Sequence, residues 1–344
     1  MIDFRYHVVS IIAVFLALTV GLVIGASVIN QDSVALLNKE YSDANSAKLS
    51  AQEQLRELQG TASLYEQFID ETAPTLTLNQ LISQSVVLVQ IAGANSGAVT
   101  GTNQLISKQA GASVGIDLTV NASFTDANNA QTLNGLVGEC APTNTPITGT
   151  GAAAAMQLLD DAITASTQGP EQPTTNPSAS ASATPGNSST GCGTRPANMT
   201  PSWASTTLDA YQSLGFITIN SGPAPTGKPV AAFIAAPDQP NTTVQNTDYL
   251  ALAEGLHADG VGAVVGGTQT SAEAGGLIAA VLADATAAKS VYTVDDTDVT
   301  MGQVAVVFVI YDVAADSHAN AGHYGLVGSN DGMLPDMPSS GASG

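Results

Sequence analysis

The N-terminal region carries the longest apolar run of the chain. No charged residue stands between Val8 and Ile29, and a helix rising about 1.5 Å per residue crosses the hydrocarbon core over such a length. A cleaved signal peptide is the alternative, with Gly25-Ala26-Ser27 as a weak cleavage site, but its apolar region is normally shorter, about 7–15 residues. The pattern predicts a transmembrane helix at 8–29 behind a short cytoplasmic tail at 1–7.

The charges beside this run do not fix its orientation. Arg5 precedes the run, whereas Lys39 and Lys48 follow it, so the count of basic residues on the two sides is nearly balanced. We expect the acidic, Ser/Thr/Pro-containing body to be exported and the N-terminus to stay in the cytoplasm. The sequence leaves open whether the body resides at the inner or the outer membrane. Gly21 and Gly25 have the GxxxG spacing of pairing membrane helices, a weak signal of self-association.

A heptad pattern follows at 33–72, and we call this segment the stalk. Its seam positions alternate by four and three residues: Leu37, Tyr41, Ala44, Lys48, Ala51, Leu55, Leu58, Ala62, Tyr65 and Ile69. The pattern favours a coiled-coil dimer, although Lys48 and the alanines weaken the seam. The alternative is a helix that packs a narrow stripe on its own domain. We expect the helix to end before Pro74.

Short β-branched runs alternate with helical patterns through the rest of the chain. The runs predict strands at 85–91, 112–120, 228–236, 260–266, 291–294 and 304–312. Helical patterns lie between them at 102–110, 152–165, 247–257 and 271–284. Such alternation predicts an α/β domain with a mainly parallel sheet flanked by helices on both faces.

This α/β domain is predicted in two parts, 84–165 and 203–334. The segment 166–202 between them is rich in Pro, Ser, Thr, Gly and Asn and has too few apolar side chains to offset the entropy of ordering. We therefore expect a disordered insertion there, and a disordered tail at 335–344.

Composition excludes one class of partner and limits the core. The net charge of -21 repels phosphate backbones, so nucleic acid is not expected as a partner. Aromatic residues make up only 5% of the chain, so Val, Leu, Ile and Ala must fill the core. Cys140 and Cys192 lie in the part expected outside the cytoplasm, where disulfides persist. Either they form a bridge or they are two unrelated thiols.

Motifs for catalysis are missing from the sequence. It contains no GxxxxGK[ST] phosphate loop, no HExxH and no GxSxG elbow, so we do not expect an enzyme. The turn Gly93–Gly97 follows a predicted strand, and Asp117 lies in the next one, as in nucleotide-binding turns. Because GxGxxG is absent, chain reversal explains these glycines better.

The richest set of candidate metal ligands is C-terminal. His318, His323, Met333 and Met337 offer imidazole and thioether groups, which suit copper ions. Two surface histidines are the alternative, because the spacing matches no recognised site. Asp295, Asp296 and Asp298 form an acidic turn that could touch a cation, although a solvated connection is the simpler interpretation.

Particular residues resemble a known family. At the N-terminus these are Arg5, His7, Val8, Ser10 and the run Ala13–Leu18, followed by Gly21 and Gly25. Near the C-terminus they are Thr293–Asp296, Asp298, Gly302–Val304, Tyr311-Asp312 and Gly322–Gly325. With the heptad helix, the Val-rich strand and Leu214–Ile217 between them, the chain resembles the actinobacterial MctB-like copper transporter family, apart from its insertion at 166–202.

The resemblance implies an envelope protein that limits copper accumulation, as a channel or as part of an efflux route. It implies copper as a transported or bound ion but brings no ligand set and no established cofactor. One membrane helix cannot enclose a pore, so transport would require a homo-oligomer, formed through the stalk and the Gly21/Gly25 face. The alternative is an envelope scaffold whose effect on copper is indirect.

Overall fold

The computed structural model describes residues 4–28, 31–145, 147–169, 192, 195–315, 320–327 and 331–335. The chain divides into two units, Met1–Tyr65 and Glu66–Gly344. Most of the predicted insertion at 166–202 and all but the first residue of the predicted tail at 335–344 lie outside the described residues.

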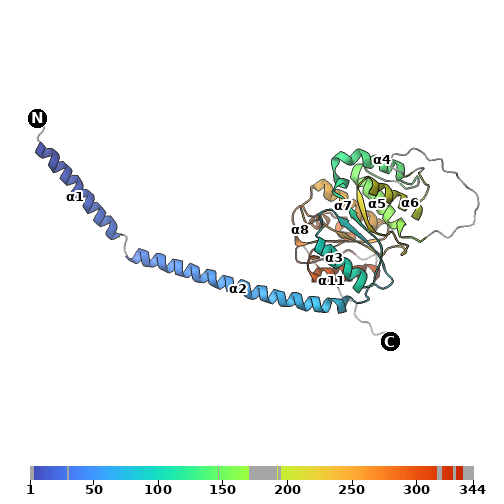
Figure 1. Cartoon of the computed structure of the whole chain (residues 1–344), viewed down its shortest axis with the longest axis horizontal. Coiled ribbons are helices and arrows are strands. Elements are labelled where there is room, and N and C mark those ends of the chain that lie inside the picture. Colours follow the sequence, from blue (N-terminus) through green and yellow to red (C-terminus); the bar gives the residue numbers. More distant parts are fainter. Residues whose placement is uncertain are drawn as a thin grey trace, which may run out of the picture. The chain divides into compact units, whose positions relative to one another are not determined.

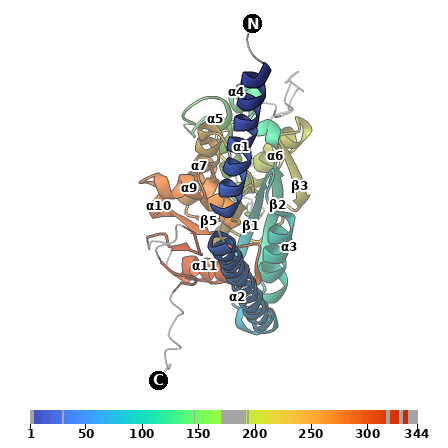
Figure 2. The same cartoon turned by 90° about the vertical axis from the view of Figure 1, so that its left-hand side faces the viewer.

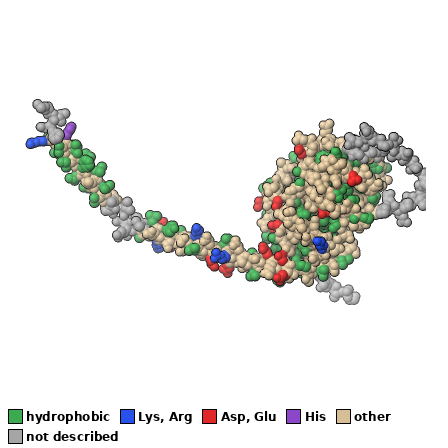
Figure 3. Space-filling view, viewed as in Figure 1, with side chains coloured by type: hydrophobic (Ala, Val, Ile, Leu, Met, Phe, Trp, Pro, Cys, Tyr) green, Lys and Arg blue, Asp and Glu red, His purple; other side chains and the backbone are tan. Residues whose placement is uncertain are grey.

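The first unit consists of α1 (Phe4–Val28) and the larger part of α2 (Gln31–Thr77). Within the described residues, Arg5–Gly25 is the one stretch of helix long and apolar enough to cross a membrane. Figure 3 shows hydrophobic side chains along α1. Helix α2 contains the whole predicted stalk at 33–72. Its pairing with a second helix stays a prediction.

The second unit is built on a mostly parallel sheet of seven described strands in the order β3-β2-β1-β4-β5-β6-β7. Only β3 runs antiparallel to its neighbour. Figures 1 and 2 show the strands between the helices. The strands are β1 (Ser85–Ile91), β2 (Ser113–Val120), β3 (Ile217–Ser221), β4 (Ala231–Ala235), β5 (Gly262–Gly266), β6 (Val291–Val294) and β7 (His323–Tyr324). The predicted α/β fold with a mainly parallel sheet is confirmed.

Helices cover both faces of the sheet and bury two separate apolar cores. One face carries the end of α2, α3 (Ser96–Gln104), the π-helical η1 (Leu105–Gln109) and α11 (Thr300–Ala315). The other carries α4 (Ala130–Cys140), α5 (Gly151–Ser166), α6 (Pro201–Ser213), α7 (Thr243–Ala258), α9 (Leu277–Ala283) and α10 (Ala287–Ser290). Because both faces are covered, the inner strands are apolar throughout rather than alternating.

The predicted strand at 304–312 is wrong, because this segment lies in helix α11. A short apolar run rich in Val cannot be assigned to strand or helix by periodicity when every side is buried. All seven residues from Val304 to Ile310 are buried, so the helix has no polar face to reveal its period.

The stalk helix also does not end before Pro74. It continues to Thr77, although a proline inside a helix removes one backbone hydrogen bond. Ala73 and Thr77 are buried in the second unit, and the Thr77 hydroxyl donates to the Ala73 carbonyl at 2.8 Å. Packing on the core therefore holds the last turn against the local preference.

The predicted helix at 271–284 is interrupted. It forms the short α8 (Gln269–Ala272) and then α9, with Gly275 at φ +88° between them. A side-chain carbon on Gly276 would collide with the Ser271 backbone carbonyl. The two glycines thus make the chain reversal that a continuous helix would prevent.

Candidate functional site

The carboxyl edge of the parallel sheet gathers the loops that follow β1, β4, β5 and β6. Open α/β sheets bind ligands at this edge, where the strand order reverses, and here the reversal lies between β1 and β4. Their two loops are tied together, because Ala94 forms a β-bridge with Pro237 and the Asp238 N–H donates to the Gly93 carbonyl at 2.9 Å.

Asp238 is the polar centre of this crossing point. One of its oxygens accepts from Asn95 Nδ2 at 3.1 Å, and the other accepts from the Thr268 hydroxyl. Asn95 also caps α3, since its Oδ1 accepts from the backbone N–H groups of Gly97 and Ala98 at 3.0 and 3.1 Å. The donors that a phosphate would need at this helix start are therefore already occupied, and a carboxylate stands beside them. The Gly93–Gly97 turn serves chain reversal here.

The sequence suggested a solvated connection for the acidic turn after β6, and this holds only for Asp298, which is exposed. Asp295 and Asp296 are each 1% exposed. The Asp295 oxygens accept the backbone N–H groups of Leu326 and Val327, both at 2.7 Å. Burial raises the pKa of Asp295, and these two bonds oppose the rise. Asp295 therefore anchors the C-terminal segment 320–327 to the end of β6.

Asp296 is the least satisfied group at this edge. Neither of its carboxyl oxygens has a hydrogen-bond partner of ordinary geometry among the described residues. Burial, reinforced by the neighbouring charge of Asp295, raises the pKa of Asp296 to about 6. A carboxyl group with such a pKa exchanges its proton close to neutral pH.

His323 lies in β7 and is 9% exposed, so the interpretation of a surface histidine is wrong for this residue. Its Nε2 lies 2.9 Å from the Ala288 carbonyl oxygen, and its Nδ1 lies 3.0 Å from the Thr293 hydroxyl. A carbonyl can only accept, so Nε2 carries the proton. In the neutral ring, Nδ1 then accepts from Thr293, and both nitrogens have partners.

The predicted copper ligands are not assembled within the part of the chain that the structure describes. His318 and Met337 lie outside the described residues, and the ring nitrogens of His323 are hydrogen-bonded. Met333 is half-buried. No group of three or more His, Cys, Asp or Glu side chains among the described residues is placed to hold a metal ion. The set His318, His323, Met333 and Met337 stays a prediction.

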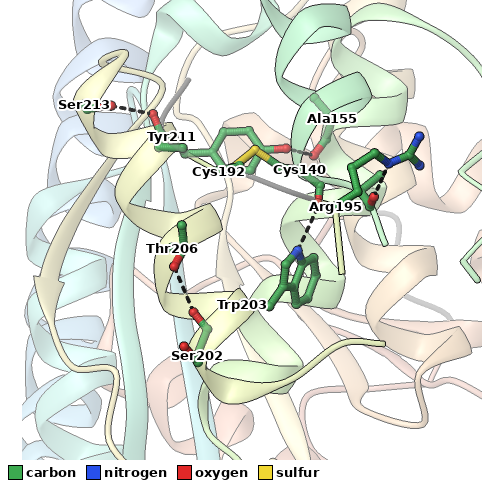
Figure 4. Close-up of a disulfide and its surroundings, with 11 residues drawn as sticks. Cys140, Ala155, Cys192, Arg195, Ser202, Trp203, Thr206, Tyr211 and Ser213 are labelled. Carbon is green, nitrogen blue, oxygen red and sulfur yellow. Dashed lines mark hydrogen bonds between the residues drawn. A yellow bond between two sulfur atoms is a disulfide. The ribbon is translucent and has the colours of Figure 1, made fainter. Parts of the chain in front are cut away.

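A disulfide joins Cys140, the last residue of α4, to Cys192, with 5.3 Å between the Cα atoms. Figure 4 shows its surroundings. Arg195 Nε donates to the Ala141 carbonyl at 2.7 Å, and Trp203 Nε1 donates to the Cys140 carbonyl at 2.7 Å. The bridge ties the distal part of the 166–202 segment to the end of α4. Its sulfurs are not thiolates, the form that binds metals.

A pair of buried carboxyl groups escaped the sequence analysis. Asp160 and Asp161 lie in α5 and are 4% and 9% exposed. The sequence does contain a signal for this pair, because the two aspartates interrupt a mostly apolar helical pattern, Met156-Gln-Leu-Leu-Asp-Asp-Ala-Ile-Thr-Ala165. Charged residues are almost never fully buried without a partner, so this pair points to an unusual environment.

The whole chain is similar to a family of copper proteins. Residues 1–335 match the family described as "Copper transport outer membrane protein, MctB". The chain is 26% identical to "Copper transporter MctB" of Mycobacterium tuberculosis H37Rv, over 94% of this chain and 96% of that protein. It is 25% identical to the protein of the same name from Mycobacterium leprae TN, over 95% of this chain and 96% of that protein.

Proposed function

The chain belongs to the MctB family of copper transport outer membrane proteins, and from this premise we propose that it limits copper accumulation in the cell envelope. The observation that carries the proposal is the extent of the match, which runs from residue 1 to residue 335. Anchor, stalk and α/β body are matched together, so the shared role is that of the whole chain rather than of one widespread domain.

In this proposal the protein is held in the membrane by α1, with its N-terminus in the cytoplasm and its body outside. The length and composition of Arg5–Gly25 support an anchor. The disulfide between Cys140 and Cys192 suits an oxidising compartment. The Lys and Arg side chains are sparse on the visible face of the second unit (Figure 3), as is expected of a surface that does not bind anionic lipid heads.

Transport of copper would require several copies, because a single helix cannot line a pore. The stalk is the surface that supports their association. Its seam side chains Leu37, Tyr41, Leu55, Leu58 and Tyr65 are 57–76% exposed. A second copy anchored in the same membrane would bring a parallel helix to this seam. Gly21 and Gly25 have open space around them and would let two anchors approach closely.

Copper in cells lacking the gene is the direct test. We expect excess cell-associated copper in the deletion strain and a normal level after complementation with the full chain. An unchanged copper level in the deletion strain would refute the proposal and favour the scaffold role.

Copper binding by the purified full chain in detergent separates direct from indirect action. We expect stoichiometric binding that weakens in His323→Ala. His257→Ala is the matched control, because His257 is exposed on α7. If the chain binds no copper while the deletion strain still accumulates it, the protein acts on copper through partners.

A further inference from the structure

Helices α5 and α7 enclose an acidic cavity on one side of the sheet. The cavity has a volume of about 340 Å³, and four carboxyl groups line it. Asp160 and Asp161 come from α5, Glu254 from α7, and Asp259 from the end of α7. We call this cavity the four-acid pocket.

Asp160 is pressed against the backbone of α7. A side-chain carbon on Gly255 would collide with Asp160 Oδ2, so a glycine is needed at that position for the two helices to approach. Asp160 Oδ1 accepts the Asp161 backbone N–H at 2.6 Å. The carboxyl group is therefore held against two helix backbones, and the Asp160 side chain is buried.

Few positive charges face the four-acid pocket. Lys228 precedes β4 and lowers the pKa of Asp259, but it does not contribute to the shifts of Asp160 or Asp161. From α6, the buried Tyr211 faces the two aspartates, which raise its pKa further. Asp284, after α9, adds its negative charge to Glu254. His257 is exposed on α7 and does not line the cavity.

Burial raises the pKa of all four acids of the pocket. Burial, followed by the charges of Asp161 and Asp259, raises the pKa of Asp160 to about 9. Burial and the charge of Asp259 raise the pKa of Asp161 to about 7. Burial also raises the pKa of Glu254 and of Asp259. Asp160 and Asp161 therefore lose their protons at different points across the neutral and alkaline range.

We propose that the four-acid pocket is a proton-dependent switch that sets how tightly α7 packs on α5. With protons on Asp160 and Asp161, the two helices pack across a neutral contact. When these protons leave, like charges from α5 and α7 face one another across the contact, and the Asp160 carboxyl group lies directly against the Gly255 backbone. The inference does not depend on the proposed copper function.

The direction of the switch follows from proton linkage. The unfolded chain releases the Asp160 proton near pH 3.8, whereas the folded chain holds it to about pH 9. The contribution of the Asp160 proton to the stability of the folded chain is complete below pH 3.8 and is lost as the pH rises to about 9. Opening should begin near pH 7, where Asp161 ionises.

Hydrogen exchange of the full chain in detergent, corrected for intrinsic rates, tests the switch. Between pH 6 and pH 9 we expect amide protection in α5 and α7 to fall at least tenfold, while β1 and β4 stay protected. In the double variant Asp160→Asn, Asp161→Asn this fall should disappear. Protection in α5 and α7 that is constant between pH 6 and pH 9 in the natural protein would overturn the proposal, whether or not the variant folds.

A charge-matched control separates the pocket from net charge. The double variant Asp209→Asn, Glu273→Gln removes two exposed acids and should retain the full pH response. The emission of Trp203, the single tryptophan of the chain, reports on α6 beside α5 and should shift to the red at pH 9 only when Asp160 and Asp161 are present. An equal pH response in both double variants would also overturn the proposal.

Discussion

Replacing Asp160 by Asn should stabilise the protein at neutral pH. The folded chain must hold a proton on Asp160 that the unfolded chain gives up, because the pKa is about 9 in one state and near 3.8 in the other. A pH of 7 lies about three units above the unfolded-chain pKa of 3.8, and each unit lowers the free energy of unfolding by about 1.4 kcal/mol. The buried carboxyl group therefore costs on the order of 4 kcal/mol at pH 7.

Asparagine removes this cost while keeping the local contacts. Its Oδ1 can still accept the Asp161 backbone N–H, and its size matches that of a protonated aspartic acid. The variant should gain up to about 4 kcal/mol in the free energy of unfolding at pH 7. The gain should be less than about 1 kcal/mol at pH 4, because pH 4 lies close to the pKa of 3.8 at which the unfolded chain gives up this proton.

Urea unfolding of the full chain in detergent, followed by Trp203 fluorescence at pH 4 and pH 7, measures both values. Trp203 lies in the same unit as Asp160, so the transition reports on the correct part of the chain. A variant that is less stable than the natural protein at pH 7, or one whose gain is equal at the two pH values, would refute the argument from burial.

Three further changes test other parts of the fold. Cys192→Ser removes a disulfide that joins residues 52 positions apart and should lower the free energy of unfolding by about 4 kcal/mol. Thermal unfolding without reductant measures this loss. The same loss under reductant would show that the disulfide is not its source. Asp295→Ala leaves two backbone N–H groups without their acceptor and should lower the free energy of unfolding by on the order of 3 kcal/mol. Proteolysis at 320–327 should be faster in this variant. An unchanged cleavage rate would contradict the anchoring role of Asp295. Gly276→Ala should cost about 1–3 kcal/mol, because its side chain meets the Ser271 backbone, whereas Gly135→Ala in open space should be neutral or stabilising in the same chemical denaturation assay.

The local sequence pattern predicted most strands of the sheet correctly, but it gave the wrong element where a segment is completely buried. Strands such as 85–91 are bounded by turn residues and rich in Val, so their type follows from short-range preferences. The segment 304–312 has a similar composition, but its residues 304–310 are all buried, and none of these seven is polar enough to record the helical period. Pro74 failed as a stop signal for a related reason, because the core contacts of Ala73 and Thr77 lie far away in the sequence.

The candidate site was harder to predict because its chemistry depends on burial. Asp295, Asp296 and His323 are polar residues in segments rich in Gly, Asn and Asp, which normally lie on the surface. Apart from the Thr293 hydroxyl, the partners of Asp295 and His323 are backbone groups of Leu326, Val327 and Ala288, which no side-chain motif can reveal. The family resemblance located these residues, but only the fold assigned hydrogen bonds to them.

These hydrogen bonds constrain the copper binding proposed for this protein. In the part of the chain that the structure describes, the sulfurs of Cys140 and Cys192 are bonded to each other, both ring nitrogens of His323 are engaged, and Asp295 is occupied by backbone N–H groups. Beyond Met333, the proposed copper ligands would come from outside the described residues, from release of one of these bonds, or from a second copy. Each route has its own signature: loss of binding in His318→Ala, dependence on reductant, or dependence on protein concentration.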